Sequence, residues 1–177
     1  ALAFQVLGQD DAMVADSATR LRMLGVLAQA AGSRGMVGGQ AIDLAAVGQE
    51  LGLAELENMH IHKTGALIRA SVLLGALSQP KVEPAVLERL DHYAKCIGLA
   101  FQIRDDILDV IGDAATLGKT TGADRALNKP TYPTLLGLDG AREHARMLHE
   151  EALASVQPLG PEAEPLRWIA SYIVERA

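Results

Sequence analysis

One helical stretch carries an amide and three carboxylates in surroundings that are otherwise nearly all apolar. These polar side chains are Gln102, Asp105, Asp106 and Asp109. On a helix that turns about 100° per residue, the four positions fall within roughly 100° of one another. The rest of the circumference is hydrophobic apart from Arg104, whereas an ordinary surface helix has a broad face of mixed charge. The pattern indicates an acidic stripe, Gln102 to Asp109, that lines an internal cavity.

The acidic stripe has the composition of a site for a hard cation. Asp105 and Asp109 are one helical turn apart, so their like charges repel unless a cation or a proton neutralises them. Mg²⁺ prefers oxygen ligands and typically takes one or two carboxylates together with substrate phosphates. A solvated acidic face is the alternative. The stripe lies near the C-terminal end of its helix, where the macrodipole disfavours negative charge, and this favours a metal or cationic ligand.

A second group of polar residues lies on another expected helix. His60, Lys63 and Thr64 share one face, and Gly65 weakens the helix directly after them. A kink there would turn the carbonyl groups of Lys63 and Thr64, and the Thr64 hydroxyl, into a cavity. A lysine among apolar neighbours can equally well extend its ammonium group to water. His60 and His62 lack metal-binding partners at a convincing spacing, so both are expected to be neutral structural residues.

A third candidate is the segment 112–133, which is rich in Gly, Thr and Asp and has no sustained apolar period. A loop of this length in a helical domain is more often a functional lid than a simple connector. Its lysines, Lys119 after Gly118 and Lys129 after Asn128, suit phosphate binding together with backbone N–H groups. The residue order of a Walker A loop is absent, and a flexible solvated loop is the alternative.

The composition indicates a single all-helical domain. The 177 residues are 49% hydrophobic but only 3% aromatic, so Ala, Leu, Ile and Val at helical spacing must form the core. Helices are predicted over residues 1–8, 17–33, 40–51, 54–77, 84–111, 134–156 and 165–175. The inner side of the second helix is expected to carry Leu21, Leu24, Leu27 and Ala28. A turn containing Gly35, Gly38 and Gly39 would let two backbones approach closely.

Charge and hydropathy exclude several classes of function. The net charge of −6 argues against general binding of nucleic acid, which needs a basic surface. No apolar run is long enough to span a bilayer and no signal peptide is visible, so a cytoplasmic location is expected. Cys96 is expected to be a structural buried thiol. The chain begins as though inside a helix, which predicts that residues 1–177 follow a further N-terminal segment.

The three groups of polar residues and the apolar helices around them together imply one class of ligand, a diphosphate that carries a hydrocarbon chain. The carboxylates would bind a metal ion, the lysines would bind phosphate, and the apolar helix walls would contact the hydrocarbon chain. The run Phe101-Gln102-x-x-Asp105-Asp106-x-x-Asp109 resembles the second aspartate-rich motif of the trans-isoprenyl diphosphate synthases. The further landmarks that resemble this family are Gly38-Gly39-Gln40-x-x-Asp43, His60-x-x-Lys63-Thr64-Gly65, Gly118-Lys119 and Asn128-Lys129-x-Thr131-Tyr132-Pro133. The resemblance covers nearly the whole chain and is closest to bacterial members of the farnesyl diphosphate synthase (geranyltranstransferase) type.

The resemblance implies an all-α, isoprenoid-synthase-type bundle that here lacks its N-terminal helices, with residues 1–177 as the C-terminal part of the domain. It implies a prenyltransferase that uses Mg²⁺, or Mn²⁺ in its place, to join isopentenyl diphosphate to dimethylallyl or geranyl diphosphate. The implied product is a short-chain isoprenyl diphosphate, in the first place farnesyl diphosphate. The family's first aspartate-rich motif is absent from this sequence, so the stretch alone is expected to be inactive. Members of the family are commonly homodimers.

The resemblance also implies a role for each matching residue. The carboxylates that would hold Mg²⁺ or its waters are Asp105, Asp106, Asp109 and Asp124. The side chains that would contact the allylic diphosphate are Lys63, Lys119, Lys129 and Gln102. Those that would take part in catalysis are Lys63, Thr64 and Gln102, the last two by stabilising the allylic carbocation. A structural role near the cavity is implied for Gln40 and Asp43.

Other interpretations stay open. A geranylgeranyl or longer-chain synthase would carry the same residues, because product length in this family is set mostly by residues just before the first aspartate-rich motif. A type I terpene cyclase has the same helical fold but usually an Asn/Ser/Glu-type second metal motif. A non-catalytic partner subunit of a heteromeric prenyl synthase would not need the complete set of metal and phosphate residues. An intact first motif upstream would favour the enzyme over the partner subunit.

Overall fold

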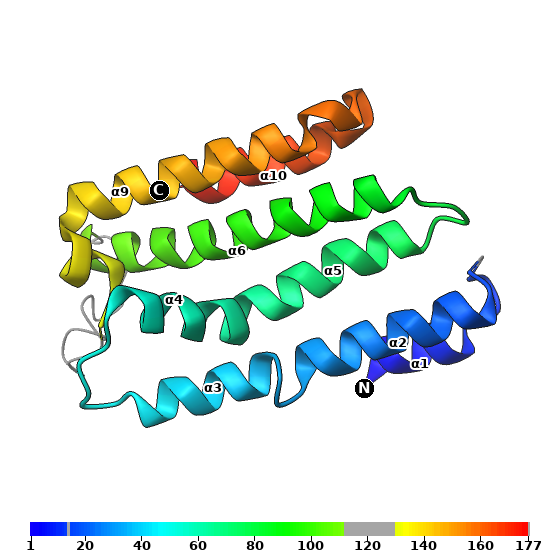
Figure 1. Cartoon of the computed structure of the whole chain (residues 1–177), viewed down its shortest axis with the longest axis horizontal. Helices are drawn as coiled ribbons and strands as arrows, with labels where there is room; N and C mark the ends of the chain where they lie inside the picture. Colours follow the sequence, from blue (N-terminus) through cyan, green and yellow to red (C-terminus); the bar gives the residue numbers. More distant parts are fainter. Residues whose placement is uncertain (14, 112–129, 177) are drawn as a thin grey trace.

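Long helices lie side by side along the length of the molecule (Figure 1). The computed structural model describes residues 1–13, 15–111 and 130–176, and every regular element in these ranges is helical, which confirms the predicted all-α class. The α-helices are α1 (Leu2–Gln9), α2 (Ser17–Ala31), α3 (Met36–Ala45), α4 (Leu53–His60), α5 (Ala66–Leu77), α6 (Pro84–Ile111), α9 (Tyr132–Val156) and α10 (Glu164–Glu175). The shorter turns are the π-helical η1 (Ile61–Gly65) and the 3₁₀ turns η2 (Gln157–Leu159) and η3 (Pro161–Ala163).

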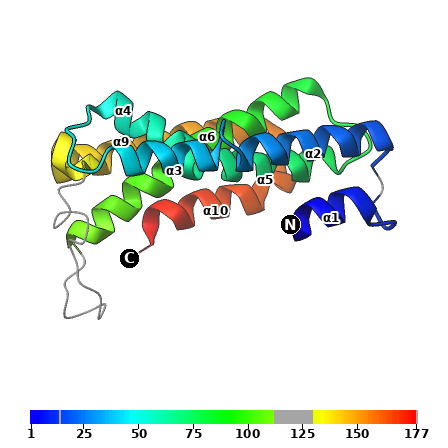
Figure 2. The same cartoon turned by 90° about the horizontal axis from the view of Figure 1, so that it is seen from below.

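The central helix is α6, which has α9 and α10 on one side and α4 with α5 on the other (Figure 1). The turned view places α1 and α10 toward one side of the layer that the other helices form (Figure 2). The N-terminal half of α6 enters a buried cluster around Tyr93 and Ile97, and its C-terminal half a second one around Ile103 and Ile107. The acidic stripe is therefore held on a helix whose other faces are packed.

The start of α9 is fixed by a capping box. The Thr131 hydroxyl accepts from the backbone N–H of Thr134 at 3.4 Å, and the Thr134 hydroxyl accepts from the backbone N–H of Thr131 at 2.9 Å. Pro133 at the second helical position has the backbone angle that a first turn requires. The hydrogen bond from the backbone N–H of Tyr132 to Asp106 then holds this first turn of α9 beside the C-terminal half of α6.

Two predictions about the N-terminal helices were only partly right. Leu24 and Leu27 pack against a buried cluster as expected, but Leu21 and Ala28 do not. Leu21 is 71% exposed and Ala28 is exposed, whereas Met23 is fully buried. Met23 packs with residues of α1 and α5, and this contact, rather than the apolar pattern of α2 alone, determines which face points inward. The predicted glycine turn is shorter than expected, because α3 begins at Met36 and contains Gly38 and Gly39.

Cys96 is buried at 4% exposure, as predicted for a structural thiol. Burial, together with the neighbouring Glu151 carboxylate, raises the pKa of its thiol to about 11. The thiol is therefore protonated near neutral pH. Among the helices that the structure describes, none combines the length and apolar character that crossing a membrane requires.

Candidate active site

A cavity of about 220 Å³ lies where α3, the α4–η1 junction, α6 and the start of α9 meet. Its polar lining is formed by Asp43, His60, Lys63, Gln102, Asp105, Asp106 and Thr131. Ala46, Leu51 and Met59 supply apolar wall. Gln102, Asp105 and Asp106 of the acidic stripe thus face the same cavity as His60 and Lys63 of the second polar group. Thr64 and Asp109 are not among the lining residues.

Gln102 is the centre of a hydrogen-bond network at this cavity. Its Oε1 accepts from the Thr64 hydroxyl at 3.0 Å and lies 2.9 Å from Nδ1 of His60. Because Oε1 is an acceptor, His60 donates from Nδ1. The Gln102 amide nitrogen donates to Asp105 at 3.3 Å. The network fixes the orientation of the amide, with its carbonyl toward η1 and its N–H toward the acidic stripe.

Replacing Gln102 with Leu is expected to lower the free energy of unfolding by about 1–3 kcal/mol, because the Thr64 and His60 donors lose their acceptor in a partly closed environment. Urea denaturation followed by circular dichroism measures the change. Gln79, which is exposed beyond the end of α5, provides the matched control. Gln79→Leu is expected to change stability by no more than about 0.5 kcal/mol. Equal losses in the two variants would contradict the role of the network.

The irregularity predicted at Gly65 takes the form of a π-helical turn, η1, rather than a simple kink. Such turns occur frequently at functional sites because the wider turn disturbs the regular backbone ladder. Gly39 of α3 packs directly against η1, since a Cβ atom at this position would fall on the backbone nitrogen of Lys63. On the other side, a Cβ at Gly98 would lie 3.3 Å from Cα of Gly65. Glycines of α3 and α6 therefore hold η1 between two closely packed backbones.

Lys63 lies in the cavity and forms an ion pair with Asp43, with 2.8 Å between Nζ and Oδ2. The Lys63 side chain is 32% exposed and that of Asp43 is 10% exposed. The alternative that Lys63 only extends to bulk water is therefore wrong. Asp43 positions the ammonium group, whereas Gln40, its neighbour in the sequence motif, is exposed and is not among the residues that line the cavity.

The three carboxylates of the acidic stripe differ in their surroundings. Asp105 accepts from Gln102 and forms an ion pair with Arg176. Asp106 accepts from the backbone N–H of Tyr132 at 2.9 Å, so the start of α9 anchors it. Asp109 is partly exposed one turn further along α6 and is not among the lining residues. The structure thus brings Asp105 and Asp106 to the cavity and places Asp109 at its margin.

Arg176 is a site residue that the sequence did not reveal. Beyond its ion pair with Asp105, its guanidinium group lies 4.4 Å from the centre of the Phe101 ring. Its backbone carbonyl accepts from Nε of Arg104 at 2.9 Å. Arg104, the one charge on the apolar side of the stripe, therefore holds the end of the chain against α6. The charge of Arg104 among apolar neighbours on its helix was the only sequence signal for its contact with Arg176.

The sequence also did not reveal a row of three stacked rings, those of His60, Tyr132 and His144. The buried ring of Tyr132 stacks on His60 at 5.7 Å between centroids and on His144 at 6.1 Å. His144 in turn lies 3.2 Å from a carboxylate oxygen of Glu57. Burial raises the pKa of Tyr132, so its hydroxyl stays protonated. His60 is thus a packed residue, in line with the structural role expected for it, and it also lines the cavity.

Three predicted site residues, Lys119, Asp124 and Lys129, lie outside the described residues. The same is true of the Gly118-Lys119 and Asn128-Lys129 parts of the motifs. The described site therefore rests on α3, the end of α4, η1, α6 and the start of α9.

The helical fold and a cavity shared by carboxylates and a lysine define the class of this protein. The chain belongs to the polyprenyl synthetase family, whose model matches residues 1–158. It is 50% identical to farnesyl diphosphate synthase from Escherichia coli (strain K12), over 99% of this chain and 60% of that protein. It is 44% identical to farnesyl diphosphate synthase from Haemophilus influenzae, over 89% of this chain and 53% of the other. The chain thus spans between about half and three fifths of these relatives.

Solved structures agree with this assignment. An FPP/GFPP synthase from Zymomonas mobilis is 39% identical, with a TM-score of 0.83 over 98% of this chain and 57% of that one. A geranyltransferase from Helicobacter pylori, determined with magnesium and isoprenyl diphosphate, is 31% identical, with a TM-score of 0.79 over 98% of this chain and 55% of that one. The resemblance to the isoprenyl diphosphate synthases and the isoprenoid-synthase-type fold are therefore confirmed.

Proposed function

We propose that this chain forms part of a prenyltransferase that joins isopentenyl diphosphate to an allylic diphosphate and releases farnesyl diphosphate. The observation that carries the proposal is the cavity in which Asp105 and Asp106 of α6 face Lys63 of η1. Relatives named farnesyl diphosphate synthase, 44% and 50% identical, support this product. Geranylgeranyl diphosphate is the second candidate product, because a geranylgeranyl pyrophosphate synthase from Catharanthus roseus is 45% identical.

We further propose that residues 1–177 are the C-terminal part of one helical domain. The large apolar side chains exposed on the first three helices support this arrangement, since further helices would cover them. The most exposed are Leu2 at 72%, Leu21 at 71% and Leu44 at 66%. A homodimer and a cytoplasmic location, both implied by the resemblance or by the absence of targeting signals, stay predictions.

The donor set at the cavity fits a divalent cation. Membership of the family implies a divalent metal in general, and Asp105 and Asp106 offer the hard carboxylate oxygens that Mg²⁺ or Mn²⁺ accepts. The hydrogen bond from Tyr132 orients one oxygen of Asp106, as a metal ligand requires. Asp109, one turn further, is in position to hold a water of the ion. Mg²⁺, when bound, would stabilise the negative charge that develops on the diphosphate leaving group.

Other side chains of the cavity would bind the diphosphate, stabilise the carbocation and exclude water. Lys63 has three N–H donors and directs one to Asp43, so the others can be directed to diphosphate oxygens. Gln102 lines the cavity beside η1, where the dipole of its amide would stabilise an allylic carbocation, and the Thr64 hydroxyl, which donates to Gln102 Oε1, would act through it. The apolar wall residues would exclude water from that cation. Asp43 acts on the substrate only through Lys63.

Lys63→Ala in the full-length protein is expected to raise KM for geranyl diphosphate about 10–100-fold, because it removes a charged hydrogen bond worth about 1.5–3 kcal/mol. Steady-state kinetics at saturating isopentenyl diphosphate measures this change. Lys95→Ala is the matched control. Lys95 also forms an ion pair, with 2.8 Å between its Nζ and Oδ2 of Asp91, but it does not line the cavity. A thermal melt verifies that both variants are folded. A KM for Lys63→Ala that matches Lys95→Ala would remove Lys63 from the diphosphate site.

A product assay tests the proposed function. The full-length protein is incubated with isopentenyl diphosphate, dimethylallyl diphosphate and Mg²⁺, and the products are identified by mass spectrometry. We expect the fifteen-carbon farnesyl diphosphate to accumulate. A cyclic hydrocarbon formed from a supplied allylic diphosphate, without consumption of isopentenyl diphosphate, would instead identify a terpene cyclase. No turnover of either kind would favour a partner subunit.

A further inference from the structure

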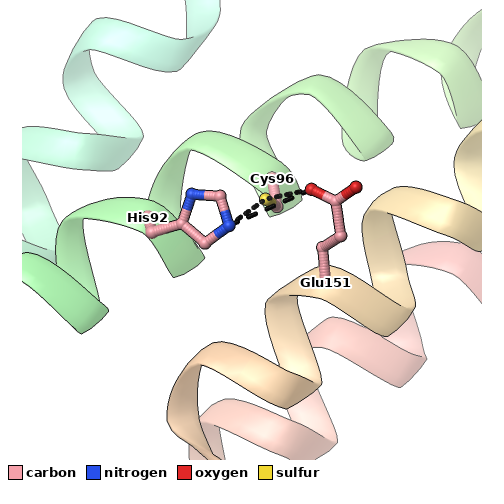
Figure 3. A group of neighbouring side chains, drawn as sticks. All are labelled: His92, Cys96 and Glu151. Atoms are coloured by element: carbon pink, nitrogen blue, oxygen red, sulfur yellow. Dashed lines mark hydrogen bonds and ion pairs between the residues drawn. The ribbon is translucent and has the colours of Figure 1, made fainter.

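A second cluster of potential metal ligands lies between the N-terminal half of α6 and α9 (Figure 3). None of its residues lines the cavity. His92 and Cys96 are one helical turn apart on α6, and Glu151 reaches them from α9. The Cys96 sulfur lies 3.8 Å from Nε2 of His92 and 3.8 Å from Oε2 of Glu151. The same His92 and Glu151 atoms are 3.9 Å apart. None of these residues takes part in the proposed prenyl transfer.

The three donor atoms have the geometry of a metal site. They form a nearly equilateral triangle with sides of 3.8, 3.8 and 3.9 Å. The point equidistant from the corners of such a triangle lies about 2.2 Å from each, the side divided by √3, and Zn²⁺ binds nitrogen, oxygen and sulfur at about 2.0–2.3 Å. A tetrahedral ion lies above the plane of the three atoms, and at these ligand distances the atoms must be about 3.3–3.7 Å apart. Small rotations of the His92 and Glu151 side chains, without a change in the helices, would therefore seat a zinc ion. By contrast, the His92–Glu151 separation is too long for an N–H···O hydrogen bond, which is about 2.7–3.2 Å.

The chemistry of the donors selects the kind of ion. A thiolate and an imidazole suit Zn²⁺ and similar transition metals, whereas Mg²⁺ and Ca²⁺ prefer oxygen ligands alone. Thiolate and carboxylate together carry two negative charges, which balance the charge of Zn²⁺. The Cys96 thiol would release its proton to solvent on binding. The cluster thus differs in preference from the oxygen-only acidic stripe.

The surroundings of the cluster suit an ion that enters from solvent. Cys96 is 4% exposed and sits in the packed layer between α6 and α9. The side chains of His92 and Glu151 are 55% and 54% exposed. The buried sulfur would form the rigid base of the site, and the open side would admit the ion and leave its fourth position for water.

We propose that His92, Cys96 and Glu151 bind one Zn²⁺ ion, with water as the fourth ligand, and that the ion links α6 to α9. The proposal is independent of the proposed function, because the site shares no residue with the cavity.

Cobalt titration of the full-length protein tests the site. Co²⁺ takes the place of Zn²⁺ and gives a sulfur-to-metal charge-transfer absorption only when a thiolate binds it. The titration is run with excess Mg²⁺, which occupies the carboxylates of the acidic stripe, and with a thiol-free reductant. We expect a charge-transfer band at one equivalent of Co²⁺ that added Zn²⁺ abolishes. We also expect Cys96→Ala to remove the band, and His92→Gln or Glu151→Gln to weaken binding at least tenfold.

Two controls keep the test decisive. His92 and Glu151 are exposed, so their variants remain folded even if Cys96→Ala does not. Arg89, which lies one turn before His92 on α6 and is also exposed, supplies the matched variant Arg89→Gln, which is expected to bind as the wild type does. The proposal is overturned if no band forms, or if the band persists unchanged in all three ligand variants.

Discussion

Asp105→Asn in the full-length protein is expected to lower kcat about 10²–10³-fold while the fold stays intact. Asp105 faces the cavity, and its carboxylate is oriented by the Gln102 amide and by Arg176. The substitution keeps the shape of the side chain but removes one of two anionic ligands beside the diphosphate. Charge on the leaving group would then be stabilised less well in the transition state. Turnover at saturating Mg²⁺, with circular dichroism to verify the fold, measures the effect.

The structure also predicts an order of effects along the acidic stripe. Asp109→Asn is expected to lower kcat less than Asp105→Asn, because Asp109 lies at the margin of the cavity. Asp139 on α9, with a side chain that is 97% exposed, provides the matched control, and Asp139→Asn is expected to leave kcat unchanged. Near-normal turnover of Asp105→Asn at saturating Mg²⁺ would contradict the metal-binding role proposed for this carboxylate.

Gly39→Ala is expected to destabilise the protein by about 3 kcal/mol or more. The new Cβ atom would fall on the backbone of Lys63, which cannot move aside as a flexible side chain would. Either α3 must shift away from η1 or η1 must change its conformation. In the second case Lys63 would also leave its position beside Asp43, so any folded fraction should bind geranyl diphosphate more weakly. Urea denaturation measures the loss of stability.

Gly75 on α5 offers a control for helix propensity. A Cβ atom there meets nothing within 4 Å, so Gly75→Ala is expected to stabilise the protein by up to about 1 kcal/mol. Opposite signs for the two glycine substitutions would show that close backbone approach, and not glycine content, matters at α3. If Gly39→Ala were as stable as the wild type, the packing described for η1 would be wrong.

Helices that begin or end at residues with a clear structural preference, such as proline, were predictable from the sequence. The bounds predicted for α6, 84–111, match the structure because Pro84 sets its start and the apolar period continues to its end. The break near Gly65 was also predictable, since glycine weakens a helix wherever it occurs. Its π-helical form was not, because that depends on how the backbone of α3 packs at Gly39.

The candidate site was predictable as a set of residue types, and less so as a set of contacts. The spacing of the acidic stripe is enough to indicate which face of α6 lines the cavity. The Lys63–Asp43 ion pair and the Arg176–Asp105 ion pair join separate elements, and no periodicity in the sequence encodes such pairings. Leu21 illustrates the same limit for the core, because contacts with α1 and α5 decide which face of α2 is inside.

The central claim is that the acidic stripe and Lys63 form one site for a metal-bound diphosphate. Calorimetric binding of an unreactive thiolo analogue of geranyl diphosphate to the full-length protein tests it most directly. We predict that removing Mg²⁺ weakens binding at least tenfold, and that Asp105→Asn and Lys63→Ala each do the same in its presence. An affinity that is unchanged by metal removal and by both substitutions would contradict it.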